Sequence, residues 1–113
     1  MGESGVNLVL CTAPASHADA LAEALLAEGL VACVNQIGPV RSRYRWQGAI
    51  EAAEEVLLVI KTSSERIAEL ERRVVALHPY QVPEFLVFPA VSGLPAYLAW
   101  VRDSCAGPGR GGP

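Results

Sequence analysis

The segment from His78 to Glu84 concentrates the residue types of this chain that could do chemistry. It reads His-Pro-Tyr-Gln-Val-Pro-Glu and places an imidazole, a phenol and a carboxylate around two prolines. A residue before proline is disfavoured in the helical region, and proline lacks a backbone donor. The segment is therefore predicted to be a rigid, non-helical corner that holds the side chains of His78, Tyr80 and Glu84 in fixed directions.

The composition predicts a single domain with more apolar surface than a small monomer buries. The 113 residues are 51% hydrophobic and 19% charged, against roughly 25% charged in typical soluble domains. Part of this apolar surface is expected to face a second copy of the chain. The net charge of -3 argues against a nucleic-acid partner. No apolar run approaches the ~20 residues of a membrane span, so we expect no membrane partner either.

The three cysteines, Cys11, Cys33 and Cys105, are odd in number and form no Cys-x-x-Cys pair. This pattern favours reduced thiols in a cytoplasmic protein over a disulfide framework or a closed zinc site. Cys11 and Cys33 are expected to pack as small apolar groups. The chain start lacks the basic and apolar regions of a signal peptide. We expect one domain over residues 6–104, with flexible tails at 1–5 and 105–113.

Hydrophobic periodicity predicts four strands and three helices. Strands are expected over Val6–Ala13, 31–46, 49–61 and 84–90. Two helices are expected to begin at capping boxes, at Ser16 with Asp19 and at residues 62–65, and the third near Pro95. The order predicts an α+β, ferredoxin-like βαββαβ sandwich with an antiparallel sheet in the order 4-1-3-2 and an extra C-terminal helix.

The second and third predicted strands form a long hairpin arm. Gly38-Pro39 predicts a bulge in the second strand, and Gln47-Gly48 predicts a tight turn. An extended arm of ~15 residues spans roughly 50 Å, whereas a compact domain of 100 residues has a radius of gyration of only ~13 Å. The arm is therefore expected to project from the domain or to wrap onto a neighbour.

The predicted topology brings Cys11, His78 and Glu84 to one end of the sheet. The first strand and the second helix both end there, and the fourth strand begins there. A thiolate and an imidazole with a carboxylate suit copper or zinc better than magnesium or calcium. No ligand spacing in the sequence requires a metal. The alternative is that His78 complements the C-terminal end of its helix, with Tyr80 and Glu84 forming a local brace.

The arm carries arginines in alternation, at positions 41, 43 and 45, with Tyr44 and Trp46 between and after them. A two-residue turn would set Arg41 opposite Glu54 and Tyr44 opposite Glu51. This pairing favours a solvated, charge-paired hairpin. The alternative is an anion site lined by the arginines.

Several segments, in this order and spacing, are similar to those of one known family. They are LCTA at 10–13, LVACVN at 30–35, YRWQG at 44–48, VLLVIKT at 56–62, the corner itself, and YLAW at 97–100. From about residue 6 to 104 the chain resembles the divalent-cation tolerance proteins of the CutA (CutA1) family. The resemblance implies a ferredoxin-like protomer in a homotrimer built like the PII signalling proteins, with a cytoplasmic role in tolerance to copper and other divalent cations.

The resemblance also implies a metal site at the corner. Copper-binding members of the family use a cysteine at the position of Cys11 and two adjacent histidines before Pro-Tyr. Here the first of the two is Leu77 and only His78 remains. Cys11, His78 and Glu84 are therefore the candidate ligands for Cu²⁺ or a similar divalent cation.

Two functions follow from these predictions. The first is a non-enzymatic trimer that binds copper weakly at the corner. The second is a PII-like sensor of a small anionic ligand in clefts between subunits. Its candidate residues are Arg43, Tyr44, Trp46, Lys61, Tyr80 and Tyr97, with Glu84. An enzyme is not expected, because the chain shows no nucleophile–base arrangement and no phosphate-binding glycine loop.

Overall fold

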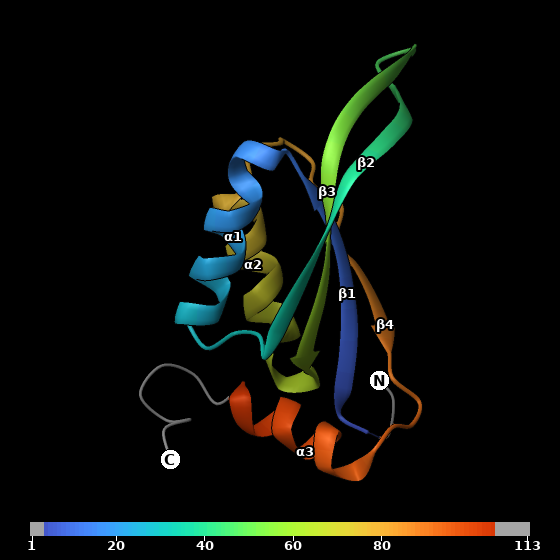
Figure 1. The fold of residues 1–113 in the computed structure, drawn as a ribbon. Coiled ribbons are helices and arrows are strands. Elements are labelled where there is room, and N and C mark those ends of the chain that lie inside the picture. Colours follow the sequence, from blue (N-terminus) through green and yellow to red (C-terminus); the bar gives the residue numbers. More distant parts are fainter. Residues whose placement is uncertain (1–3, 106–113) are drawn as a thin grey trace.

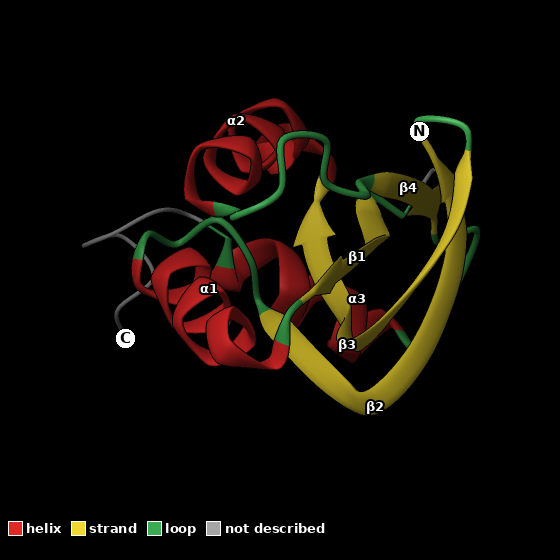
Figure 2. Ribbon diagram, turned by 90° about the horizontal axis from the view of Figure 1, so that it is seen from above, coloured by secondary structure: helices red, strands yellow, loops and turns green. Residues whose placement is uncertain are grey.

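The computed structural model describes residues 4–105 as a two-layer α+β fold (Figure 1). A four-stranded antiparallel sheet in the order β2-β3-β1-β4 carries α1 and α2 on one face (Figure 2). The strands are β1 (Val6–Ala13), β2 (Cys33–Trp46), β3 (Ala49–Ser63) and β4 (Leu86–Pro89). The helices are α1 (Ala15–Ala27), α2 (Ile67–Leu77) and α3 (Pro95–Ser104), with a 3₁₀ turn over Ser64–Arg66. The predicted fold class and sheet order are confirmed.

The main core lies between the sheet and helices α1 and α2. Strand alternation sends every second side chain of β1 toward the helices, so Val9 and Cys11 are fully buried. They pack in one cluster with Ile60 of β3, Leu25 of α1 and Leu70 of α2. Burial of these apolar side chains holds the helices on the sheet and fixes the end of α2 against the end of β1.

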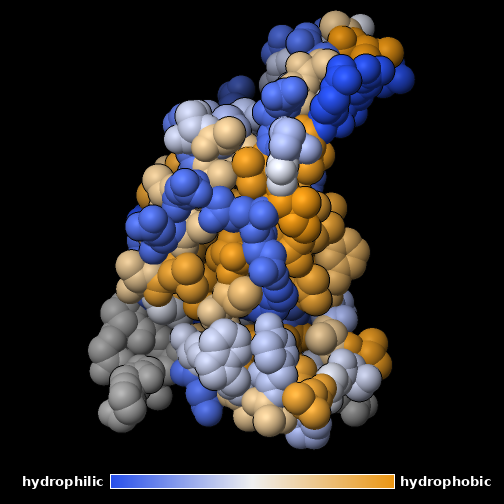
Figure 3. Space-filling view, viewed as in Figure 1, coloured by the Kyte–Doolittle hydropathy of each residue, from blue (hydrophilic) through white to orange (hydrophobic). Residues whose placement is uncertain are grey.

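On the other face of the sheet, α3 covers the end at Val6, which packs against Val101. The rest of this face carries apolar side chains without a helix over them in the described part of the chain. The alternation that buries Val9 and Cys11 sends Leu8 and Leu10 to this side, where they are half-buried. On β4, Leu86 is 51% exposed and Phe88 is 48% exposed. In Figure 3 apolar side chains gather over the central strands. We call this surface the open sheet face.

Strands β2 and β3 continue past the end of β1 as the arm, which we define as residues 40–55 (Figure 1). The pairing skips from Ile37 to Val40, which confirms the bulge predicted at Gly38-Pro39. Gln47 and Gly48 both have positive φ, of 49° and 83°, as a tight hairpin turn requires. The predicted hairpin register is confirmed as well.

The prediction that two helices begin at capping boxes is wrong. The first turn of α1 has no side-chain cap, and Asp19 accepts a hydrogen bond from Gln36 Nε2 at 2.7 Å instead. The second segment forms the 3₁₀ turn, and α2 begins only at Ile67 without a side-chain cap. Thr62, the predicted cap of this box, donates from its Oγ1 to the carbonyl of Leu30 at 2.8 Å instead. In both cases a distant partner takes a polar side chain that local sequence assigns to the capping box.

The ends of the folded part differ from the predicted tails. Ser4 Oγ donates to the carbonyl of Ala90, the Gly5 carbonyl accepts from Ser64 N, and Cys105 is buried. These residues are therefore held by the fold, whereas residues 1–3 and 106–113 of the expected tails lie outside the described residues. Helix α3 begins at Pro95 as predicted, and β4 is shorter than the predicted strand at 84–90.

Within residues 4–105, no helix has both the length and the apolar character that crossing a bilayer needs.

Candidate functional site

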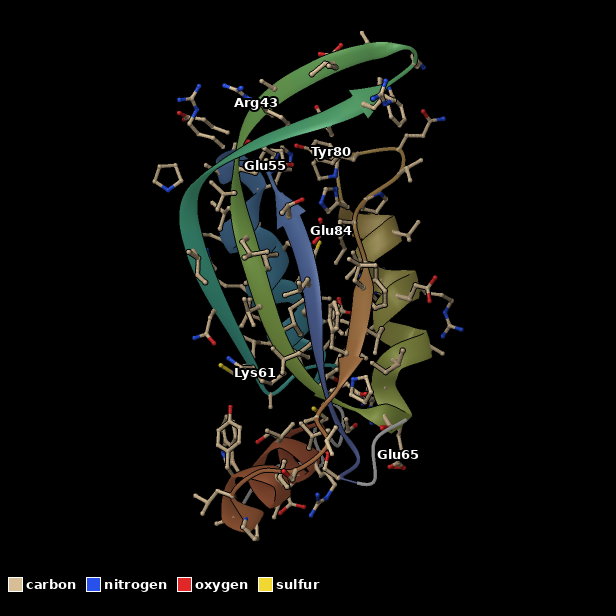
Figure 4. The ribbon with its side chains drawn as sticks, turned by 90° about the vertical axis from the view of Figure 1, so that its right-hand side faces the viewer. Arg43, Glu55, Lys61, Glu65, Tyr80 and Glu84 are labelled. Atoms are coloured by element: carbon tan, nitrogen blue, oxygen red, sulfur yellow. The ribbon has the colours of Figure 1, made fainter. Side chains whose placement is uncertain are left out.

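The corner begins where α2 ends at His78. The backbone of His78 is extended, with φ of -76° and ψ of 141°, as expected for a residue before proline. Its N–H still donates to the carbonyl of Val74 at 2.9 Å and closes the last helical turn. The chain then turns toward the start of β4, with Tyr80 and Glu84 on the connecting segment (Figure 4).

Both ring nitrogens of His78 are hydrogen bonded. Nε2 lies 2.7 Å from the carbonyl oxygen of Thr12, and Nδ1 lies 3.0 Å from the backbone nitrogen of Tyr80. A carbonyl oxygen only accepts and a backbone N–H only donates, so Nε2 carries the proton and Nδ1 accepts. The imidazole is neutral and 7% exposed. It links β1 to the corner and has no free lone pair for a metal in this arrangement.

The thiol of Cys11 is sealed in the main core. Its exposure is 0%, and its Sγ donates to the carbonyl of Thr12 at 3.7 Å. Burial, and after it the negative charges of Glu84 and Glu55, raise the pKa of Cys11 from 9.0 to about 12. The thiolate that would bind a soft metal is therefore strongly disfavoured at neutral pH.

The predicted ligands of a corner metal site thus lie near one another without forming a ligand set. Among residues 4–105, no three or more His, Cys, Asp or Glu side chains are arranged to hold a metal ion. Copper binding by Cys11, His78 and Glu84 stays a prediction. The alternative prediction was that the His78 ring complements the C-terminal end of α2. The ring instead bonds to the carbonyl of Thr12 on β1 and does not reach the last carbonyls of α2.

An open cleft of about 690 Å³ lies between the arm and the corner. We call it the arm–corner cleft. The arm contributes five residues to its lining, Ser42, Arg43, Tyr44, Trp46 and Glu55. The corner contributes the five residues from Tyr80 to Glu84, and Thr12 closes the end of β1. Figure 4 shows Arg43, Glu55 and Tyr80 close to where the arm leaves the sheet, with Glu84 beside β4. Five of the predicted site residues meet here: Arg43, Tyr44, Trp46, Tyr80 and Glu84.

A buried carboxylate joins the two sides of this cleft. Glu55 is only 5% exposed, and its Oε2 accepts a hydrogen bond from the hydroxyl of Tyr80 at 2.7 Å. Burial and this contact with Glu55 raise the pKa of Tyr80 well above its usual range. The phenol therefore stays protonated and keeps donating to Glu55, which fixes the corner relative to the arm.

The charged groups of the cleft have no ionic partner in the described part of the chain. The two ion pairs found in residues 4–105 are Glu69–Arg72 and Glu28–Arg73, both on helices. Arg41 and Glu54 are aligned across the hairpin as predicted, yet they form no ion pair, so the charge-paired hairpin is wrong. Arg73 of α2 donates two hydrogen bonds to Glu28 and so joins α2 to the end of α1. Within residues 4–105 the carboxylate of Glu84, which lines the cleft, has no ionic partner. Arg43 borders the cleft, but it pairs with Ala52, so strand alternation puts its side chain on the face of the arm that carries Arg41 and Glu54.

Two predicted ligand residues lie elsewhere. Lys61 is at the opposite end of the sheet from Arg43 (Figure 4), where its ammonium donates to Asn35 Oδ1 and lies 3.9 Å from Cys33 Sγ. Tyr97 is on α3, and its ring is 5.6 Å from that of Trp100. One chain therefore does not bring Lys61 and Tyr97 into the arm–corner cleft.

Glu55 is the site residue that sequence reasoning missed. It precedes the apolar run of β3, and strand alternation places it on the side of Leu57 and Val59. An acid that alternates in register with apolar residues is the signal that could have found it. The signal is incomplete, because the partner Tyr80 comes from a segment 25 residues away.

The sequence matches one known family along most of its length. The family model of the CutA1 divalent ion tolerance protein matches residues 7–104. The chain belongs to the CutA1 family. It is 43% identical over 99 residues to the divalent-cation tolerance protein CutA of Thermus thermophilus, an alignment that covers 87% of this chain and 96% of that protein.

Two solved CutA structures have the same fold. The PII-like protein CutA from Nostoc sp. PCC 7120 is 36% identical to this chain and superposes with a TM-score of 0.84. The match covers 88% of this chain and 96% of the Nostoc chain. The periplasmic divalent cation tolerance protein CutA from Archaeoglobus fulgidus is 38% identical, with a TM-score of 0.85. The match covers 88% of this chain and 98% of the Archaeoglobus chain. The chain is therefore a CutA1 protein with a PII-like fold, and these descriptions name ion tolerance and no reaction.

Proposed function

We propose that this CutA1 protein serves in tolerance to divalent cations as a non-enzymatic, PII-like protein that binds a small ligand in the arm–corner cleft. The observation that carries the proposal is the cleft itself. Its volume suits a small molecule, and it presents Glu55 and Glu84 with no ionic partner in residues 4–105. The names of the relatives support the link to cations, and the internal bonding of Cys11 and His78 favours the cleft over the corner as the binding site.

A ligand screen by thermal shift tests this function. The panel includes nucleotides, organic acids, amino acids, Cu²⁺ and Zn²⁺. We expect at least one compound to raise the melting temperature of the wild type and to lose this effect in Glu55→Gln. The matched control is Glu54→Gln, which removes the same charge from the same strand outside the cleft lining. A panel without any hit, or hits that survive in Glu55→Gln, would count against the cleft.

The open sheet face supports a homotrimer, the assembly that resemblance to the family implies. Leu8, Leu10, Leu86 and Phe88 form a continuous apolar surface across β1 and β4, since Leu8 pairs with Phe88 and Leu10 with Leu86. Burying such a surface against other copies removes its apolar area from water. Sedimentation equilibrium is expected to give a mass of about 36 kDa, three times the 12.0 kDa of one chain.

A substitution on that face separates assembly from folding. Phe88→Asp is expected to give a folded 12.0 kDa monomer, because a carboxylate at the centre of an apolar interface is strongly unfavourable. Glu71→Gln, at an exposed position of α2, is the control and keeps the trimer. A stable 12.0 kDa wild-type monomer would contradict this part of the proposal.

A cytoplasmic location stays a prediction. It is supported by the three cysteines, which are all free thiols in the structure. Cell fractionation with an antibody against the chain tests it, and recovery from an extracytoplasmic compartment would contradict it.

A further inference from the structure

Glu55 accepts fewer hydrogen bonds than an ionised carboxylate can. Such a group offers about four acceptor sites, and in residues 4–105 the hydroxyl of Tyr80, bound to Oε2, is the one donor found on Glu55. The Oε1 atom has no donor in those residues and is not fully sealed, so it keeps contact with the cleft that Glu55 lines. The residue is nevertheless only 5% exposed. A charged oxygen so nearly removed from water gains strongly from a cationic donor.

A second carboxylate, that of Glu84, lines the same cleft from the corner. Figure 4 shows Glu84 below Glu55 and Tyr80. After burial, the negative charges of Glu84 and Glu55 are what raise the pKa of Cys11, so both carboxylates lie near the end of β1. Neither has an ionic partner within residues 4–105. Two like charges at one site repel each other, and a cation that contacts both relieves this repulsion.

The arm presents aromatic rings to the cleft, and its arginines point away from it. Glu55 is opposite Val40 in the hairpin, so strand alternation puts Tyr44 and Trp46 on the same face as Glu55 and puts Arg43 on the other face. The rings of Tyr44 and Trp46, 44% and 41% exposed, line the cleft. Aromatic faces attract ammonium groups through their quadrupoles. The cleft therefore combines negative charge with aromatic surface.

This combination favours an organic cation over a bare metal ion. Among the described residues, no three His, Cys, Asp or Glu side chains are arranged to hold a metal. The cleft volume of about 690 Å³ is that of a small-molecule site, and Val82 and Pro83 add apolar lining from the corner. An ammonium group donates several N–H bonds to carboxylate oxygens, while its carbon chain packs on the rings and the apolar lining.

We propose that the arm–corner cleft binds a small aliphatic amine as its ammonium ion, with the N–H groups donating to Glu55 and Glu84 and the carbon chain against the rings of the arm. The inference rests on the proposed ligand-binding function and names the ligand class of that same site. It differs from the anionic ligand predicted from the arginines, because that prediction lacked Glu55 and the Arg43 side chain is on the opposite face.

Calorimetric titration in phosphate buffer, which contains no competing amine, tests the ligand class. The amine probes are 1-aminobutane, 1,4-diaminobutane and 1,5-diaminopentane. The matched probes without an ammonium group are 1-butanol, succinate and Mg²⁺, which represent a neutral chain, an anion and a bare cation. We expect at least one amine to bind about tenfold or more tightly than each of these three, because it alone offers both N–H donors and a carbon chain.

Variants of the two carboxylates locate the bound amine. Glu55→Gln keeps an acceptor for Tyr80 and is expected to weaken binding of the best amine by about tenfold or more. Glu84→Gln, at a half-buried position, is expected to weaken it as well. The control Glu54→Gln removes the same charge outside the cleft lining and should bind as the wild type does. Arg43→Gln should bind the amine at least as tightly as the wild type.

Denaturation curves show whether each variant is folded, and an amine that binds both folded Gln variants as it binds the wild type overturns the inference.

The remaining outcomes separate the ligand class from the site. Succinate or Mg²⁺ that binds more tightly than every amine and is lost in Glu55→Gln overturns the amine and leaves the cleft as a ligand site. The amine is overturned in the same way when a compound of the thermal-shift panel depends on Glu55 and no amine binds. If neither the probes nor the panel binds, the ligand class and the proposed function both fail.

Discussion

The corner core around Cys11 and His78 and the arm–corner cleft lie next to each other and differ in how their polar groups are satisfied. In the corner core, the imidazole has a partner on each nitrogen and the thiol is sealed and protonated. In the cleft, Glu55 has one donor and Glu84 has no ionic partner within residues 4–105. Groups with internal partners stabilise a fold, whereas groups without them are available to a ligand. The residue types favoured the corner as the site, and the bonding favours the cleft.

The reactivity of Cys11 is the largest expected difference between the two regions. At pH 8, a thiol reagent should label Cys11 at least about a thousandfold more slowly in the native protein than in guanidinium, because reaction needs opening of the core. Time-resolved labelling followed by peptide mass spectrometry measures the rate at each cysteine. Rapid native labelling of Cys11 would show that the corner core is open.

Loss of the His78 ring should destabilise the fold. His78→Ala leaves the carbonyl of Thr12 and the N–H of Tyr80 without partners, which is expected to lower the free energy of unfolding by about 3 kcal/mol. Chemical denaturation at a fixed protein concentration measures it. The control is His17→Ala, an exposed residue expected to change stability by less than about 0.5 kcal/mol. A His78→Ala protein as stable as the wild type would mean that the ring serves another purpose.

Alkaline pH should weaken the protein through the same core. Folding raises the pKa of Cys11 from 9.0 to about 12, so the unfolded chain releases this proton first. The stabilisation is complete below pH 9 and falls as pH rises toward the folded value, by on the order of 2 kcal/mol at pH 10.5. The raised pKa of Tyr80 adds a loss in the same direction above pH 10. Denaturation curves of Cys11→Ala should lack the first part of the decline; an identical decline would rule out Cys11 as its source.

Arg43 gives the smallest expected effect on stability. Arg43→Gln should leave the free energy of unfolding unchanged within about 0.5 kcal/mol, because the side chain is exposed and forms no ion pair in residues 4–105. The measurement is the same denaturation series as for His78→Ala. A loss as large as that of His78→Ala would erase the contrast between the cleft and the corner core.

The fold was predictable because several local signals agree with its topology. The apolar run from Val56 to Ile60, the pair Gln47-Gly48 and the break at Gly38-Pro39 each act within a few residues, and all three are confirmed. The capping boxes failed because capping competes with distant partners. Thr62 bonds to Leu30, and Asp19 bonds to Gln36, and neither contact leaves a trace in local sequence.

The site was predictable only in part. Arg43, Tyr44, Trp46, Tyr80 and Glu84 were expected to bind, and the structure gathers them in one cleft. The state of each group depends on contacts across the fold. The hydrogen bond from Tyr80 to Glu55 and the ring contact of His78 with Thr12 join segments 25 and 66 residues apart in sequence. Such contacts decide which charged group stays unpaired, and a list of residue types does not contain them.

A crystal of the protein carrying the tightest-binding compound, then soaked in copper, distinguishes the cleft from the corner core as the binding site. Data collected at the copper absorption edge locate any metal, and the difference density locates the ligand. We expect ligand density in the arm–corner cleft between Glu55 and Glu84, with no anomalous peak between Cys11 and His78. An anomalous peak bonded to Cys11 Sγ and His78, with the cleft empty of ligand, would reverse the assignment and make the corner core the site.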